Sequence, residues 1–213
     1  MGSPSALPSQ PPRELILASA SPRRRELLGQ LAIPFTVIPA NIDESAWPDE
    51  VPRAYTMRVA YAKAQYIAQR FPTAVVLGAD SIVVLEQQIF GKPRDMAEAR
   101  SMLTRLSGRE HTVITGLAVL HQAQHFVGLD AVRTLVRFRP LSASVIESYL
   151  VTGEALDKAG AYAIQGAAAA FVASRDGCYT NVVGLPLRRT ATLLHAAGLH
   201  LPTLPGHSAQ SAS

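Results

Sequence analysis

The chain has 213 residues, 48% hydrophobic and 17% charged, which is enough apolar sequence for a buried core and excludes a mostly unfolded chain. A formal net charge of +4 indicates an anionic partner without separating nucleotide, nucleic acid and membrane surface. No apolar run approaches the roughly 20 residues of a membrane helix, and one cysteine, Cys178, excludes an internal disulfide and a cysteine-based zinc cluster. We therefore expect a cytoplasmic protein.

Proline- and serine-rich sequence at both ends predicts two disordered tails around a single folded domain. The tails are residues 1–12 and 201–213, and the domain covers residues 13–200. Strands and helices alternate in its first half. Short apolar runs predict strands at 14–18, 35–39 and 74–80, followed by a strand pair within 81–90.

Two helices are expected between these strands. The first runs from Pro22 to about residue 31, because Ser21 is a typical N-cap and proline suits the first helical position. The second spans about 54–70. Helical spacing predicts that its buried face carries Val59, Ala62, Tyr66 and Phe71.

The second half of the domain is expected to contain a long antiparallel hairpin and three helices. Asp95 caps the first helix, which ends near residue 106, and Glu98 completes a capping-box pattern. The other segments are strands 111–121 and 125–138 around a Gln-Ala-Gln turn, helices from Ser142 or Ser144 to about 152 and over 185–197, and mixed loop and strand over 160–184. Together these elements predict a mixed, twisted α/β sheet with flanking helices.

The first cluster with chemical potential is S-A-S-P-R-R-R at 19–25, where a strand gives way to a helix. It places hydroxyls, free backbone N–H groups and three guanidiniums at a helix N-terminus, which suits phosphate. It is not a P-loop, because the pattern G-x-x-x-x-G-K-[ST] is absent. A capped helix with solvated arginines explains the cluster equally well.

Two acidic clusters could form a metal site. G-A-D-S at 78–81 ends a buried strand, so Asp80 could orient a divalent ion or accept a proton from water. N-I-D-E at 41–44 supplies Asp43 and Glu44, oxygen donors that could complete a Mg²⁺ site. Taken singly, a turn-capping aspartate and a polar loop are the simpler interpretations.

Two further clusters could bind a nucleotide. G-K-P at 91–93 presents Lys92 outward, where it could contact a phosphate, although a solvated turn lysine is the simpler interpretation of this segment alone. The segment 153–166 contains acidic, basic, glycine and amide residues close together and shows neither a helix nor a strand pattern. Gln165 could therefore contact the edge of a nucleotide base. For this segment a functional role is the better interpretation.

Other chemistries lack support in the sequence. The six histidines show no metal-ligand spacing, no G-x-S-x-G elbow is present, and Cys178 shows no sign of a nucleophile. The basic residues are not interleaved with aromatic residues, which argues against a nucleic-acid partner. No nucleic-acid or membrane partner is expected.

Together these segments resemble the Maf family of nucleoside triphosphate pyrophosphatases over about Leu15 to Leu187. The matching segments are LASASPRRRELL at 17–28, the Asp43-Glu44 pair, Ala-Lys-Ala around Lys63, GADS, GKP, LSGREHTVITGLAV at 106–119, DKAGAYAIQG at 157–166 and NVVGLPL at 181–187.

The resemblance implies a Maf/ITPase-like α/β fold with a nucleotide cleft between two lobes. It implies hydrolysis of nucleoside triphosphates to monophosphate and pyrophosphate with a divalent metal cation, Mg²⁺ or Mn²⁺. Asp80 would be the catalytic base toward the α-phosphorus and, with Glu44, a metal ligand. The implied substrate-binding residues are Ser19, Arg23, Arg24, Lys63, Ser81, Lys92, Lys158 and Gln165.

At three positions the chain resembles the family branch that acts on dTTP and UTP: Arg23, the position directly after Asp80, and Gln165. The resemblance also allows a further role in the removal of modified nucleotides. Ser81 replaces the usual threonine, which keeps the hydroxyl and could loosen base preference. A homodimer is also consistent with the family. The alternative function is a non-catalytic, nucleotide-sensing regulator of cell division.

Overall fold

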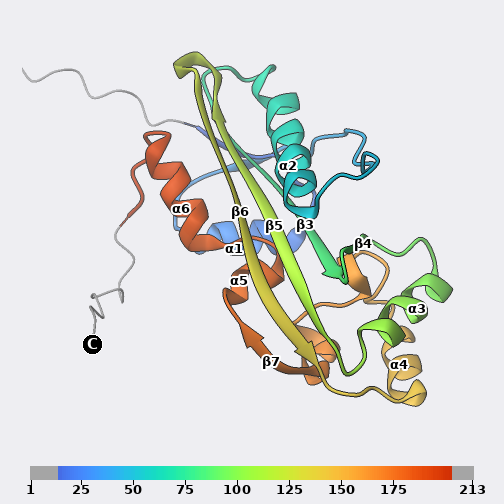
Figure 1. The fold of residues 1–213 in the computed structure, drawn as a ribbon. Coiled ribbons are helices and arrows are strands. Elements are labelled where there is room, and N and C mark those ends of the chain that lie inside the picture. The colour runs from blue at the N-terminus through green and yellow to red at the C-terminus, as the bar shows by residue number, and fades with distance from the viewer. Residues whose placement is uncertain (1–13, 203–213) are drawn as a thin grey trace, which may run out of the picture.

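The computed structural model of the chain describes residues 14–202, so the predicted tails lie outside it except for positions 201 and 202. Within these residues, seven strands form one mixed sheet in the order β2-β1-β3-β5-β6-β7, with β4 paired to β3 (Figure 1). The strands are β1 (Leu15–Leu17), β2 (Thr36–Val37), β3 (Val75–Leu85), β4 (Gln88–Phe90), β5 (Glu110–His121), β6 (Phe126–Phe138) and β7 (Val172–Asp176). The predicted mixed α/β class is confirmed.

The predicted long hairpin is formed by β5 and β6. Glu110 lies opposite Arg137 at one end, and His121 lies opposite Phe126 at the other. A 3-10 turn, η1 (Gln122–Gln124), joins the two strands. Both strands begin and end within one residue of their predicted bounds.

Helices flank the sheet, and none of those in residues 14–202 is long and apolar enough to cross a membrane. They are α1 (Pro22–Gly29), α2 (Pro52–Ala68), α3 (Met96–Leu106), α4 (Ala143–Leu150), α5 (Tyr179–Val183) and α6 (Leu187–Ala196). The segment 160–184, expected to mix loop and strand, also contains the 3-10 turns η2 (Ala159–Ala161) and η3 (Gly166–Phe171) and the helix α5.

Three helices begin at the predicted cap residues. The side chains of Ser21, Asp95 and Ser142 each accept the backbone N–H three residues further on. The capping box is half formed, because the Glu98 carboxylate accepts the N–H of Arg94 rather than that of Asp95.

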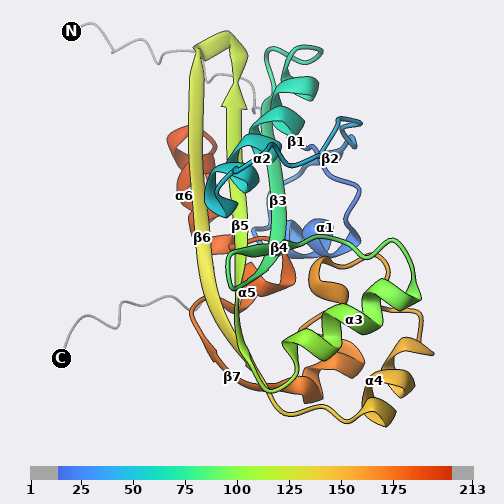
Figure 2. The same cartoon turned by 45° about the vertical axis from the view of Figure 1, so that its right-hand side comes forward.

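The core consists of three clusters of buried side chains. Ala60 and Ala64 of α2 pack on one face of β1, β3 and β5. Leu28 of α1 and Leu194 of α6 pack on the opposite face. Further along β3, α3 and α4 pack around Val83 at the end of the sheet away from the β5–β6 turn (Figure 2). Different helices therefore pack against the two ends of β3.

The predicted buried face of the second helix is only partly correct, because Val59 is buried but Tyr66 and Phe71 do not belong to that face. Tyr66 is 40% exposed and Phe71 follows the end of α2. The buried residues of α2 are Thr56, Val59, Ala60, Lys63, Ala64, Ile67 and Ala68. Four of these seven residues are alanine or threonine, and these small side chains let α2 lie close to the sheet.

Two glycines permit this close approach. A Cβ atom at Gly78 of β3 would lie 2.2 Å from the carbonyl oxygen of Ala60. A Cβ atom at Gly116 of β5 would lie 2.3 Å from the carbonyl oxygen of Thr56. These contacts are far below van der Waals distance, so α2 depends on both glycines for its position.

Replacing Gly78 with alanine is expected to lower the free energy of unfolding by about 1–3 kcal/mol, because the new methyl group forces α2 away from β3. Urea denaturation measures this change. Gly29→Ala is the matched control, since a Cβ atom there meets nothing within 4 Å. Equal unfolding free energies for Gly78→Ala and the unmodified protein would contradict the close packing described here.

Candidate active site

A polar site lies where one edge of β3 is open. β1 pairs with β3 as far as Leu77, β4 pairs with it from Val83, and the continuous pairing with β5 occupies the other edge. Asp80 and Ser81 lie in the gap between β1 and β4. This place, beyond the carboxyl end of the parallel strand β1, is where open α/β sheets bind their ligands.

A buried ion pair occupies this gap. The Nζ atom of Lys63 donates to Oδ1 of Asp80 at 2.9 Å, and it lies 2.8 Å from Oε2 of Glu44. Lys63 and Asp80 are each only 7% exposed, whereas the Glu44 side chain is 48% exposed. The lysine thus joins one buried carboxylate to one that reaches solvent.

The surroundings of Asp80 favour its protonated form more than water does. Burial raises the pKa of the Asp80 carboxyl above its usual range, although the charges of Lys63 and Arg24 act in the opposite direction. A carboxylate with a raised pKa is a stronger base than a solvated one, so this position suits proton abstraction.

Arg24 is fixed at three points beside Asp80. Its Nε donates to the carbonyl oxygen of Gly184 at 2.9 Å, its Nη2 to Oγ of Ser81 at 3.0 Å, and its Nη1 to Oγ of Ser19 at 3.3 Å. Burial lowers the pKa of Arg24, and the charges of Asp80 and Glu44 oppose this effect. An arginine keeps its charge in a protein, so a fixed cation faces the gap.

The loop that carries Glu44 is tied to the start of α2. The hydroxyl of Tyr55 donates to the Glu44 carbonyl at 2.8 Å, and Nη2 of Arg58 donates to the Ser45 carbonyl at 2.9 Å. The carboxylate of Asp43 instead accepts the N–H of Ser45 at 2.9 Å. Of the predicted acidic pair, only Glu44 therefore reaches Lys63.

The donor set fits a divalent metal that is shared with a substrate. Residues 14–202 contain no group of three or more histidine, cysteine or acidic side chains able to hold a metal. Mg²⁺, however, is usually bound by one or two carboxylates, with phosphate and water oxygens completing the octahedron. Glu44 and Asp80 converge on one ammonium group and supply such a pair.

The remaining predicted residues lie around this cluster. Arg23 and Lys158 both act on the Asp157 carboxyl. Burial raises the pKa of this carboxyl, but the hydrogen bond from Lys158 and the positive charges of Lys158 and Arg23 lower it by more, so it lies below its usual range. Lys158 also donates to the Glu154 carbonyl at 2.7 Å. Its ammonium group is therefore held within its own segment.

Lys92 and Gln165 are exposed. A backbone hydrogen bond of 3.0 Å from Gly160 to the Gly91 carbonyl joins the segments that carry them. Among the described residues, no hydrogen bond or ion pair joins either side chain to Lys63 or Asp80.

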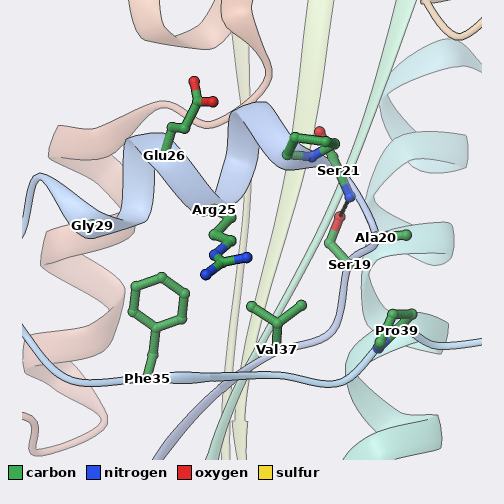
Figure 3. A pocket seen from close by; sticks show the side chains of 10 residues that line it. Ser19, Ala20, Ser21, Arg25, Glu26, Gly29, Phe35, Val37 and Pro39 are labelled. Carbon is green, nitrogen blue, oxygen red and sulfur yellow. Dashed lines mark hydrogen bonds between the residues drawn. The ribbon is translucent and has the colours of Figure 1, made fainter.

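A cavity of about 560 Å³ opens next to the cluster, between α1 and β2 (Figure 3). Ser19 lines this cavity and also bonds to Arg24 in the polar cluster. Arg25 points from α1 into this cavity, toward Phe35 and Val37 of the facing segment. Phe35 and Val37 were not predicted as part of a site, and Arg25 was named only as one of the three guanidiniums in the cluster at 19–25.

Sequence reasoning also missed the groups that support Arg24. They are Thr115, whose hydroxyl contacts Ser81, and the backbone carbonyls of Asn181 and Gly184. Thr115 and Asn181 are fully buried polar residues within two of the segments that carry the family resemblance. That burial is a usable signal only once the fold is known.

Fold and site together define a mixed α/β protein with a buried lysine–carboxylate pair and a fixed arginine at an open strand edge. Residues 14–197 match the family described as Maf-like protein, and the chain belongs to that family. The expected family is confirmed.

Relatives within this family share about half of their residues with the chain. A dTTP/UTP pyrophosphatase of Symbiobacterium thermophilum is 51% identical over 186 residues, covering 87% of this chain and 95% of that protein. A dTTP/UTP pyrophosphatase of Myxococcus xanthus is 53% identical over 188 residues, covering 88% and 94%. Among solved structures, a HAM1 protein from Coxiella burnetii is 18% identical with a TM-score of 0.45, covering 59% of this chain and 73% of that one.

Proposed function

We propose that this protein hydrolyses nucleoside triphosphates, chiefly dTTP and UTP, to the monophosphate and pyrophosphate. The observation that carries the proposal is the buried Asp80 carboxylate, bound by Lys63 and lying beside Arg24 at the open edge of β3. The names of relatives that are 51% and 53% identical over most of the chain support the same reaction and substrates.

In this proposal, Asp80 accepts a proton from water as the water oxygen bonds to the α-phosphorus. The bond from that phosphorus to the bridging oxygen breaks, and pyrophosphate leaves with the bridging oxygen. General-base catalysis of this kind is worth about 10²- to 10⁴-fold in rate. The raised pKa of Asp80 supports this role.

A triphosphate carries about four negative charges, which the site must offset for attack at phosphorus. Ser19, Arg24 and Lys63 line the gap beside Asp80, and Arg23, Lys92 and Lys158 lie in the neighbouring segments. Glu44 and Asp80 would hold a divalent metal, which would supply further positive charge to the phosphate oxygens. The mixture of buried and exposed cations supports binding of a polyanion that is partly solvated.

Gln165 is proposed to contact the base. Replacing it with alanine is expected to lower the ratio of kcat/KM for dTTP over GTP about tenfold, through loss of one or two hydrogen bonds, with a smaller change in rate. Gln122→Ala, in the turn between β5 and β6, is the control. An unchanged ratio in Gln165→Ala would show that this side chain does not select the base.

The activity is tested by incubating the full chain with Mg²⁺ and, separately, dTTP, UTP, dCTP, ATP, GTP and 7-methyl-GTP. The expected products from dTTP and UTP are equal amounts of monophosphate and pyrophosphate. Release of orthophosphate instead would contradict the proposed bond cleavage. Binding without turnover of any nucleotide would favour the non-catalytic sensor of cell division.

A further inference from the structure

Hydrogen bonds connect the guanidinium of Arg24 to the interior of the protein. Oγ of Ser81 accepts a hydrogen bond from Nη2 of Arg24 at 3.0 Å and lies 2.8 Å from Oγ1 of Thr115. Oγ1 of Thr115 in turn donates to the backbone carbonyl of Asn181 at 3.1 Å. The connection runs from α1 through neighbouring residues of β3 and β5 to α5, because Ser81 and Thr115 are paired in the sheet.

The chemistry of these groups fixes the direction of every proton in the chain. A carbonyl oxygen only accepts, so the single hydroxyl proton of Thr115 is directed to Asn181. The proton between Ser81 and Thr115 must therefore come from Ser81. An arginine N–H only donates, so Ser81 accepts from Arg24. The Ser81 hydroxyl has consequently no proton left for a substrate.

The far end of the chain is held firmly. Asn181 is fully buried, and its Nδ2 donates to the Val113 carbonyl at 3.1 Å and to Oγ1 of Thr134 at 2.9 Å. The carbonyl oxygen of Gly184, three residues further on, accepts a hydrogen bond from Nε of Arg24 at 2.9 Å. Two of the three points that fix Arg24 thus depend on the short segment that begins at Asn181.

We infer that Thr115 and Asn181 are positioning residues for triphosphate binding, and that Ser81 acts on the substrate through Arg24. This inference rests on the proposed function, in which Arg24 binds a phosphate. Three of the five guanidinium N–H groups are used by Ser19, Ser81 and Gly184, which leaves two for phosphate oxygens. A cation oriented before the substrate arrives loses little freedom on binding.

The test compares Thr115→Val with the unmodified protein. Valine keeps the shape of threonine and removes the hydroxyl, so Ser81 loses its acceptor and its oxygen no longer holds Nη2 of Arg24 in one position. KM for dTTP is expected to rise about tenfold with kcat changed less than about twofold, since a phosphate contact made equally in the bound and transition states is lost. Thr115→Ser should restore KM, because it restores the hydroxyl. Thr112→Val, on the opposite face of β5, is the matched control.

A double-mutant cycle distinguishes positioning from a general effect on the fold. In the Arg24→Ala background, Thr115→Val should raise KM no further. Equal effects in both backgrounds, or a loss confined to kcat, would overturn the inference. Should Thr115→Val fail to fold, Ser81→Ala breaks the same chain at a half-buried position and is held to the same criteria.

Arg24→Ala alone separates this inference from the proposed function. A normal KM in that variant would remove Arg24 from the site and overturn the inference. Pyrophosphate release by the unmodified protein would still support the proposed reaction. Absence of turnover in the unmodified protein would overturn the proposed reaction itself.

Discussion

Replacing Asp80 with asparagine is expected to lower pyrophosphate release about 10²- to 10⁴-fold while nucleotide still binds. The amide keeps the shape of the carboxylate and still accepts a hydrogen bond from Lys63, so the site remains assembled. It cannot accept a proton from the attacking water at neutral pH. The loss should therefore appear in kcat, with the dissociation constant for dTTP changed much less.

The measurement pairs pyrophosphate release with calorimetric binding of dTTP. Asp95→Asn is the matched control, because asparagine caps a helix as well as aspartate does. That control is expected to keep full activity. Undiminished turnover in Asp80→Asn would remove Asp80 from the role of base.

Replacing Lys63 with methionine is expected to lower kcat/KM at neutral pH by about 10²-fold. Methionine fills the space of the lysine stem and removes the positive charge between Asp80 and Glu44. Because that charge lowers the pKa of Asp80, its loss raises this pKa further. More of Asp80 is then protonated at neutral pH and unable to act as a base.

The pH profile of kcat/KM shows whether a raised pKa of Asp80 causes the loss of activity in Lys63→Met. Activity requires the deprotonated carboxylate, so a higher pKa moves the acidic limb of the profile to higher pH. In Lys63→Met, part of the lost activity should return as the pH is raised. Lys63→Arg, which keeps the charge, should shift the limb less. An acidic limb that stays at the same pH in Lys63→Met would contradict the coupling between Lys63 and Asp80.

Elements set by local chemistry were predictable from the sequence. Ser21 caps α1 and Ser142 caps α4, since a cap needs only neighbouring backbone groups. The buried face of α2 was not predictable, because spacing of large apolar residues pointed to Tyr66. The true face depends on Gly78 of β3 and Gly116 of β5, which lie far from α2 in the sequence and let its backbone approach the sheet closely.

The site shows the same division. The family resemblance indicated Asp80, Lys63 and Glu44, which the fold brings together from three separate segments. Spacing alone could not show that Asp43 turns away to Ser45. The role of Thr115 depends on its register opposite Ser81 in the sheet, and no local pattern encodes that register.

Hydrolysis of dTTP in water labelled with heavy oxygen tests whether water attacks the α-phosphorus of the triphosphate. Mass spectrometry of the products then locates the new oxygen atom. We expect the label in the monophosphate and none in the pyrophosphate. Label in the pyrophosphate would contradict this expectation, because the attack would then have occurred at the β-phosphorus.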